Sequence, residues 1–158
     1  MRSGSLRVAL SAFCLLALHS SRQVHAADQA FPAADAIIAV VGGSMAQACA
    51  KLGPPSEVYP ADPGQVCIDY GPYALLIEKR KHVTGCFFWP NWTQDVCGVH
   101  LSDSRDEMVK TLGKPQFDRQ TAADNTEVME WWNGKIKVVV QIKFKDQKCT
   151  RVMVKRPN

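Results

Sequence analysis

The feature that constrains the fold most is a short helix whose start and end are both encoded between Ser104 and Pro115. Ser104 and Glu107 form a capping box, in which each side chain satisfies a backbone amide of the other residue. Gly113 favours the left-handed conformation that ends helices, and Pro115 prevents the helix from resuming. The apolar face of this helix comprises Met108, Val109 and Leu112.

A second copy of this pattern lies sixty positions earlier in the chain. Ser44 and Gln47 form the second capping box, with glutamine in place of glutamate. Five positions match in register: Ser44 with Ser104, Gln47 with Glu107, Leu52 with Leu112, Gly53 with Gly113, and Pro55 with Pro115. Such a repeat at a fixed offset predicts an internal duplication.

Strand-like runs follow each helix. After the first helix they are Val66–Tyr70, Tyr73–Lys79 and His82–Phe88, and after the second they are Glu127–Trp132, Lys135–Lys145 and Cys149–Lys155. The dipeptide Asn133-Gly134 is a strong signal for a type I′ hairpin, and the run after it alternates apolar and polar residues. We therefore expect an α+β fold of two tandem repeats, each a short helix packed on a three- to four-stranded antiparallel meander. The expected boundaries are a lead-in at 27–43, a first repeat at 44–97 and a second repeat at 98–158.

Residues 1–26 have the features of a secretory signal peptide. Two arginines precede a mostly apolar run at 8–18, and Ala26 completes a small-residue cleavage pattern. The run is too short to span a membrane, which takes about 20 residues. Cys14 lies inside the run, whereas a lipid-attachment cysteine stands at the end of a signal. We expect a periplasmic or secreted protein, cleaved near Ala26, with neither a transmembrane segment nor a lipid anchor.

The net charge of +4 comes largely from this segment. Three of the 19 basic residues and none of the 15 acidic residues lie in it, so the exported chain is nearly neutral and no nucleic-acid partner is expected. The final section is nevertheless basic, through Lys135, Lys137, Lys143, Lys145, Lys148, Arg151, Lys155 and Arg156. These residues could contact anionic envelope surfaces, but we favour a solvated sheet face with lysines that discourage aggregation.

The helix and strand motifs resemble those of a known protein family. A serine-capped helix closed by Leu-Gly-x-Pro and followed by a meander resembles the small outer-membrane-assembly proteins of the SmpA/OmlA type. Two such units in tandem resemble the fold of beta-lactamase inhibitory protein. The matching positions are Ser104, Arg105, Glu107, Val109, Leu112, Gly113 and Pro115, with a weaker copy at Ser44, Gln47, Leu52, Gly53 and Pro55. The resemblance implies a protein-binding role and carries no catalytic residue.

Five cysteines remain after the signal: Cys49, Cys67, Cys86, Cys97 and Cys149. Disulfides are typical of exported proteins, so we predict a Cys86–Cys97 bond and, next, a Cys49–Cys67 bond, with Cys149 as the free thiol. The chain has no Cys-x-x-Cys motif and no Cys/His pairs at ligand spacing. We therefore expect neither a metal nor a cofactor.

Aromatic residues gather between Cys86 and Cys97, and a Trp-Trp pair follows later. The candidate contacts for a partner protein are Phe88, Trp89, Trp92 and Trp132. The alternative, which we favour slightly, is a core role for the loop, with Phe87 on the inner face of its strand and the tryptophans over the junction between the repeats. Because Trp131 is adjacent to Trp132 in a strand, one of them points outward, and we expect Trp131 inside. Asn91 begins a glycosylation sequon, which matters only in a eukaryotic source.

Catalytic motifs are absent from the sequence. His82 and His100 are not accompanied by a recognisable nucleophile and orienting acid, and no phosphate-binding glycine loop is present. A cysteine-histidine nucleophile is the one enzymatic option that remains open. We expect an exported, non-enzymatic protein-binding module of the bacterial envelope with a structural or assembly role. The alternative is a proteinaceous inhibitor of an exported hydrolase.

Overall fold

The computed structural model describes residues 31–78, 82–121 and 125–157. The chain divides into one unit at Met1–Phe31 and another at Pro32–Asn158, and every described helix and strand belongs to the second unit. The predicted signal peptide lies outside the described residues. The predicted lead-in at 27–43 is described from residue 31 onward and contains a short helix.

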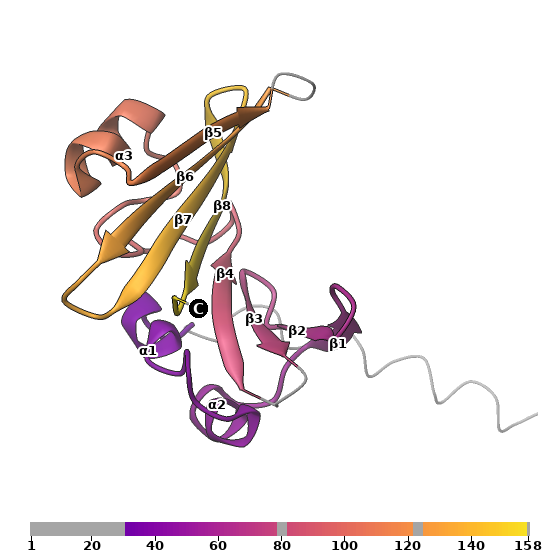
Figure 1. Ribbon diagram of the computed structural model, residues 1–158. Helices are drawn as coiled ribbons and strands as arrows, with labels where there is room; N and C mark the ends of the chain where they lie inside the picture. Colours follow the sequence, from indigo (N-terminus) through magenta and orange to yellow (C-terminus); the bar gives the residue numbers. More distant parts are fainter. Residues whose placement is uncertain (1–30, 79–81, 122–124, 158) are drawn as a thin grey trace, which may run out of the picture. The chain divides into compact units, whose positions relative to one another are not determined.

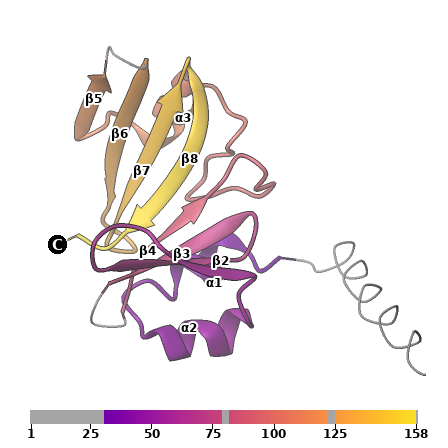
Figure 2. The ribbon, with the colours of Figure 1, turned by 90° about the vertical axis from the view of Figure 1, so that its right-hand side faces the viewer.

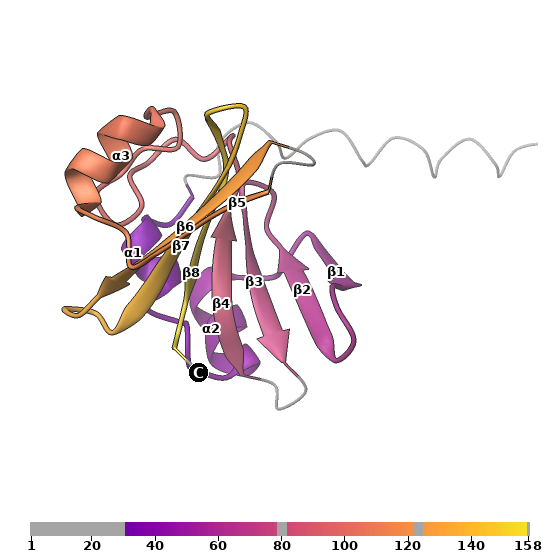
Figure 3. The ribbon, with the colours of Figure 1, turned by 45° about the horizontal axis from the view of Figure 1, so that its top comes forward.

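Most of the second unit is one antiparallel sheet (Figure 1). The elements in chain order are α1 (Ala34–Ile38), α2 (Met45–Leu52), β1 (Glu57–Pro60), β2 (Gln65–Asp69), β3 (Tyr73–Glu78), β4 (Val83–Phe88), α3 (Arg105–Leu112), β5 (Phe117–Thr121), β6 (Thr126–Asn133), β7 (Val138–Lys145) and β8 (Lys148–Lys155). The eight strands pair in the order β1-β2-β3-β4-β8-β7-β6-β5. Figure 3 shows β1 to β4 side by side, with α2 behind them.

The prediction of two separate helix-on-meander repeats is wrong, because the strands form a single sheet. Strand β8 pairs with β4 on one side and with β7 on the other, so the two halves share backbone hydrogen bonds. They also share one apolar core, with buried residues from all three described helices and from β2–β4 and β6–β8. The physical reason is the small size of the helices. Helix α2 buries only Ala48 and α3 only Met108, too little to cover a separate sheet.

The local helix signals were predicted correctly. In α3 the Ser104 Oγ accepts a hydrogen bond from the Glu107 amide at 3.3 Å, and the Glu107 carboxylate accepts one from the Ser104 amide at 2.8 Å. Ser44 and Gln47 form the corresponding box in α2, at 3.2 and 2.9 Å. Capping boxes depend on residues three positions apart, so the sequence alone identifies them.

Each of these helices is also tied to the sheet at its end. Gly53 and Gly113 follow α2 and α3 with positive φ angles of 84° and 82°. The Gly53 carbonyl accepts a hydrogen bond from the Tyr70 hydroxyl at 3.3 Å, and the Gly113 carbonyl accepts one from Trp131 Nε1 at 2.8 Å. An aromatic side chain from the sheet thus satisfies a helix-end carbonyl in both halves.

The strand predictions hold for the central strands and fail at the edges. The predicted boundaries differ by at most a few residues from those of the six central strands, β2, β3, β4, β6, β7 and β8. The edge strands β1 and β5 were not among the predicted runs, and all residues of β5 are exposed. The hairpin between β6 and β7 has a loop at 134–137 with Lys137 at positive φ, longer than a two-residue type I′ turn.

The two faces of the sheet differ in what covers them. In Figures 1 and 2 the three helices lie on one side of the sheet, and Figure 2 looks onto the other side of β5–β8, with β1–β4 seen nearly edge-on. We call this second side the open face. Residues that are paired in adjacent strands point to the same side of a sheet. One continuous row of paired residues therefore crosses the open face: Tyr59, Cys67, Leu76, Gly85, Lys155, Val139 and Trp132. Cys67 and Leu76 are buried but do not belong to the core cluster under the helices.

Candidate functional site: a depression on the open face

A depression of about 420 Å³ lies on the open face, where β1–β4 meet β8. A volume of this size is in the range of ligand-binding pockets. Its lining residues are Tyr59, Ala61, Asp62, Gln65, Cys67, Leu76, Phe87, Trp89, Arg151 and Met153. Most are apolar or aromatic, and one end carries a cation.

Strand alternation in β4 places the aromatic wall. Cys86 and Phe88 are fully buried toward the helices, so Phe87 between them points to the open face. Phe87 lies opposite Met153 of β8 in the strand register, and both line the depression. The chain then turns so that the Trp89 ring stacks on Phe87, with ring centroids 5.7 Å apart and an interplanar angle of 14°. The wall is therefore preorganised.

Arg151 is the cation of this site. Its guanidinium carbon lies 4.9 Å from the centroid of the Phe87 ring, a cation–π contact. Burial lowers the pKa of Arg151, since the side chain has lost part of its hydration. Lys143 lies opposite Arg151 in the register of β7 and β8 and points to the same face. Among the described residues, no carboxylate lies within ion-pair distance of either side chain.

One neighbouring pair of charges on the open face is, in contrast, neutralised. Lys155 Nζ lies 3.0 Å from the Glu130 carboxylate, which also accepts a hydrogen bond from the Gln141 side chain. Burial raises the pKa of Glu130, but the hydrogen bonds from Lys155 and Gln141 outweigh it, and the net shift is downward. Among the described residues, Arg151 and Lys143 thus remain without a carboxylate partner, as does Arg119 of β5, which the register places in the same row through Val128.

Tyr59 and Cys67 form the opposite wall and offer no ionised nucleophile. A hydrogen bond with the Cys67 side chain, with burial as a smaller cause, raises the pKa of Tyr59 to about 12. Burial raises the pKa of the Cys67 thiol. A thiol with a raised pKa is a poor nucleophile at neutral pH, so this wall is suited to contact and not to covalent chemistry.

The structure separates the four aromatic residues predicted to contact a partner. Trp89 is half-buried in the depression, and Trp132 is 46% exposed on the open face. Phe88 and Trp92 were wrong as contact residues, because they are 0% and 2% exposed. The Trp92 ring packs edge-on against Phe88 and Tyr73, at centroid distances of 5.0 and 5.8 Å.

The core alternative for this loop was also partly wrong. It placed Phe87 on the inner face, whereas Phe88 takes that place. Both residues are apolar, so the sequence gives no signal for which one points inward. The prediction that Trp131 lies inside is confirmed, since it is 3% exposed and donates to the Gly113 carbonyl.

The five cysteines that the structure describes are free thiols. A Cys49–Cys67 bond does not fit, because Cys67 points to the open face whereas Cys49 belongs to α2 on the other side and interacts with Tyr70. Burial, and secondly the nearby Cys97 thiol, raises the pKa of Cys86, so these two lie close and their bond stays a prediction.

The predicted free thiol, Cys149, is a core residue. It is 8% exposed, and burial raises its pKa to about 11. The His100 ring nitrogens instead have Ser102 Oγ at 2.6 Å and the Thr93 carbonyl at 3.3 Å as hydrogen-bond partners. Within the described ranges, no three His, Cys, Asp or Glu side chains are grouped to hold a metal ion.

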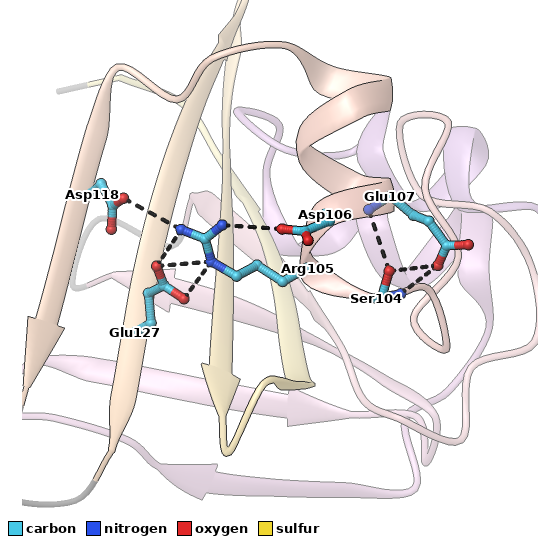
Figure 4. Close-up of polar contacts among 6 residues, drawn as sticks. All are labelled: Ser104, Arg105, Asp106, Glu107, Asp118 and Glu127. Atoms are coloured by element: carbon cyan, nitrogen blue, oxygen red, sulfur yellow. Dashed lines mark hydrogen bonds and ion pairs between the residues drawn. The ribbon is translucent and has the colours of Figure 1, made fainter.

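A second polar cluster attaches α3 to the sheet (Figure 4). The Arg105 guanidinium donates to both carboxylate oxygens of Glu127 on β6, at 2.8 to 3.0 Å. Asp118 and Asp106 lie 3.8 and 3.4 Å from the same guanidinium. The hydrogen bond to Glu127 raises the pKa of Arg105. This cation is satisfied within the protein, so the cluster positions the helix and offers no free charge.

No protein-family model matches the chain, and no curated protein sequence matches it. Among solved structures, it is similar to an extracellular protein containing a SCP domain from Bacillus anthracis, with a TM-score of 0.55 and 10% identity over 85% of this chain and 49% of that one. A DUF4309 family protein from Bacillus subtilis aligns with a TM-score of 0.47 and 11% identity over 79% of this chain and 98% of that one.

A third similar structure is a cysteine-rich secretory protein from Staphylococcus aureus, with a TM-score of 0.49 and 12% identity over 75% of this chain and 45% of that one. The chain spans about half the length of the Bacillus anthracis protein, and at 10% identity that similarity shows the fold alone. That protein is described as extracellular. No helix among the described residues is long and apolar enough to cross a membrane.

Proposed function

We propose that this chain is an exported, non-enzymatic protein-binding module that holds its partner on the open face. The signal-like residues 1–26 support export with cleavage near Ala26. The observation that carries the proposal is the composition of the open face. An aromatic wall, a cation with no counter-ion among the described residues and an exposed tryptophan occur together on a sheet surface that none of the described helices covers.

These residue types suit a protein contact. Tryptophan, tyrosine and arginine are the residues most enriched among energetically dominant contacts at interfaces. Trp132 lies within a β-strand and Trp89 directly follows one. Both residues are therefore held in place, and little conformational entropy is lost when a partner binds. We propose that the protein, when bound to its partner, has a structural or assembly role in the envelope.

The test is a capture experiment with matched variants. The purified protein is immobilised and exposed to envelope extract from its source cells. The open-face variant Trp89→Ala/Trp132→Ala is compared with a control, Met45→Ala/Ile136→Ala, which removes two exposed apolar side chains elsewhere. We expect a partner that the wild type and the control retain and the open-face variant loses, with all proteins equally stable in urea.

Equal retention by the open-face variant would contradict the proposed surface. The identity of the partner then separates the two roles. A resident envelope complex supports the assembly role. An exported hydrolase that is inhibited by near-equimolar protein supports instead the inhibitor role that the resemblance to beta-lactamase inhibitory protein implies.

A further inference from the structure

Arg151 and Lys143 give the open face a specific charge preference. They are adjacent across β7 and β8, and Arg151 lines the depression itself. No carboxylate of the described chain pairs with either one. A partly buried cation without a counter-ion is costly on its own, and a ligand that supplies the missing anion recovers this cost.

The surroundings of Arg151 favour one carboxylate over a polyanion. Phe87 holds the guanidinium against its ring, and Lys155 is already neutralised by Glu130. Asp62 lies at the other end of the depression and repels anions there. The lining of the depression therefore carries one cation, Arg151, whereas an anionic lipid surface or envelope polymer is attracted by a broad basic patch.

The rest of the depression is suited to an apolar side chain. Phe87, Trp89 and Met153 form one wall, with Leu76 on the floor between β2 and β4. An apolar group placed there covers aromatic surface that water now contacts. A ligand that pairs with the cation and also covers the apolar wall carries a carboxylate beside an apolar side chain.

We infer that the partner presents an aspartate or glutamate next to an apolar residue, with the carboxylate bound by Arg151 and Lys143 and the apolar side chain against Phe87 and Trp89. This inference rests on the proposed function and specifies the chemistry of the partner. The guanidinium fork binds carboxylates bidentately, so Arg151 is the specificity-determining residue, whereas Lys143 contributes charge.

The test uses acetylated, amidated hexapeptides with a central Asp-Leu, Asp-Phe, Leu-Asp or Phe-Asp pair, and the same peptides with asparagine in place of aspartate. Binding to the purified protein is followed by NMR chemical-shift changes and by tryptophan fluorescence. We expect at least one aspartate peptide to bind saturably and its asparagine counterpart to bind roughly tenfold more weakly or worse. Added salt weakens the first peptide more than the second.

Variants locate the binding. Arg151→Gln removes the preference for aspartate, and Arg151→Lys keeps part of it, because charge remains while the fork is lost. Lys148→Gln, an exposed lysine of the same strand, is the matched control and leaves the preference unchanged. If Arg151→Gln does not fold, Lys143→Gln and Arg151→Lys provide the comparison.

Equal affinity for aspartate and asparagine peptides overturns the inference, as does a preference that survives Arg151→Gln. Binding to phosphatidylglycerol vesicles with none to the peptides also overturns it, in favour of a membrane surface. The capture experiment with Trp89→Ala/Trp132→Ala is independent of the peptides. A partner that is lost there while the peptides fail would refute only the acidic specificity and leave the proposed function standing.

Discussion

Phe88 tests whether the sheet is one cooperative unit. Its ring is fully buried beside the β4–β8 pairing, packs against Trp92 at 5.0 Å, and lies opposite Val152. Phe88→Ala removes a large buried ring and leaves a cavity, at a cost of about 3–5 kcal/mol. A domain of this size has a stability of roughly 5–15 kcal/mol, so the variant should still fold.

The assay is urea unfolding combined with hydrogen exchange. Unfolding slopes in urea are about 1–3 kcal/mol per molar, so the midpoint should fall by about 2 M. Because both halves share one core, peptides from β2–β3 and from β6–β7 should lose protection together at the lower midpoint. Phe117→Ala on β5, where the ring is 47% exposed, is the control and should cost about 0.5 kcal/mol or less.

A different exchange pattern would refute this reasoning. If β6–β7 stayed protected at urea concentrations that open β2–β3, the halves would be independent units despite their shared sheet. The structure would then have one sheet, but the free energy of unfolding would still divide between two repeats. A shift below about 1 kcal/mol would show instead that the ring contributes little to the core.

Three further predictions concern the ion pairs and the thiols. Arg105→Met leaves the Glu127 carboxylate, 12% exposed, without its cation and should cost about 1–2 kcal/mol in urea unfolding, whereas Arg119→Met on exposed β5 should cost almost nothing. An equal cost for both would refute a stabilising role for the pair. The folded pKa of Glu130 lies below its ordinary value of 4.5, so its contribution is present above that pH and is lost as pH falls below it. Acid titration of stability should be shallower in Glu130→Gln, and an unchanged slope would contradict this. Peptide mapping without reductant of protein purified from the exported fraction should find the Cys86–Cys97 bond, and two alkylated thiols there would rule it out.

Local patterns were predictable from the sequence, and long-range pairing was not. Capping boxes and strand alternation depend on residues a few positions apart, so α2, α3 and the inward side chains of β7 follow from the sequence. The pairing of β8 with β4 joins residues about seventy positions apart, such as Val154 and Cys86, and leaves no local signature. The duplicated helix signal therefore indicated two units where the strands form one sheet.

The candidate site shows the same division. Trp132 was predicted to be exposed because its neighbour Trp131 fits the inner face. The orientation of Phe87 and Phe88 was not predictable, since both are apolar and the strand face depends on what covers it. Arg151 was recognised only as one of several basic residues. Its isolation from carboxylates depends on which strands surround it, and those contacts come from the fold.

The central place of β8 has a consequence for how the chain acquires its fold. Residues 148–155 are synthesised after β4 and β7, yet they supply the strand that joins the two halves. Until they are synthesised, β4 and β7 are edge strands with unpaired backbone N–H and C=O groups, and such edges promote aggregation. A chain that ends before β8 should therefore be insoluble and degraded. Secretion of the intact chain in an unfolded state, with folding after its release, would avoid this hazard.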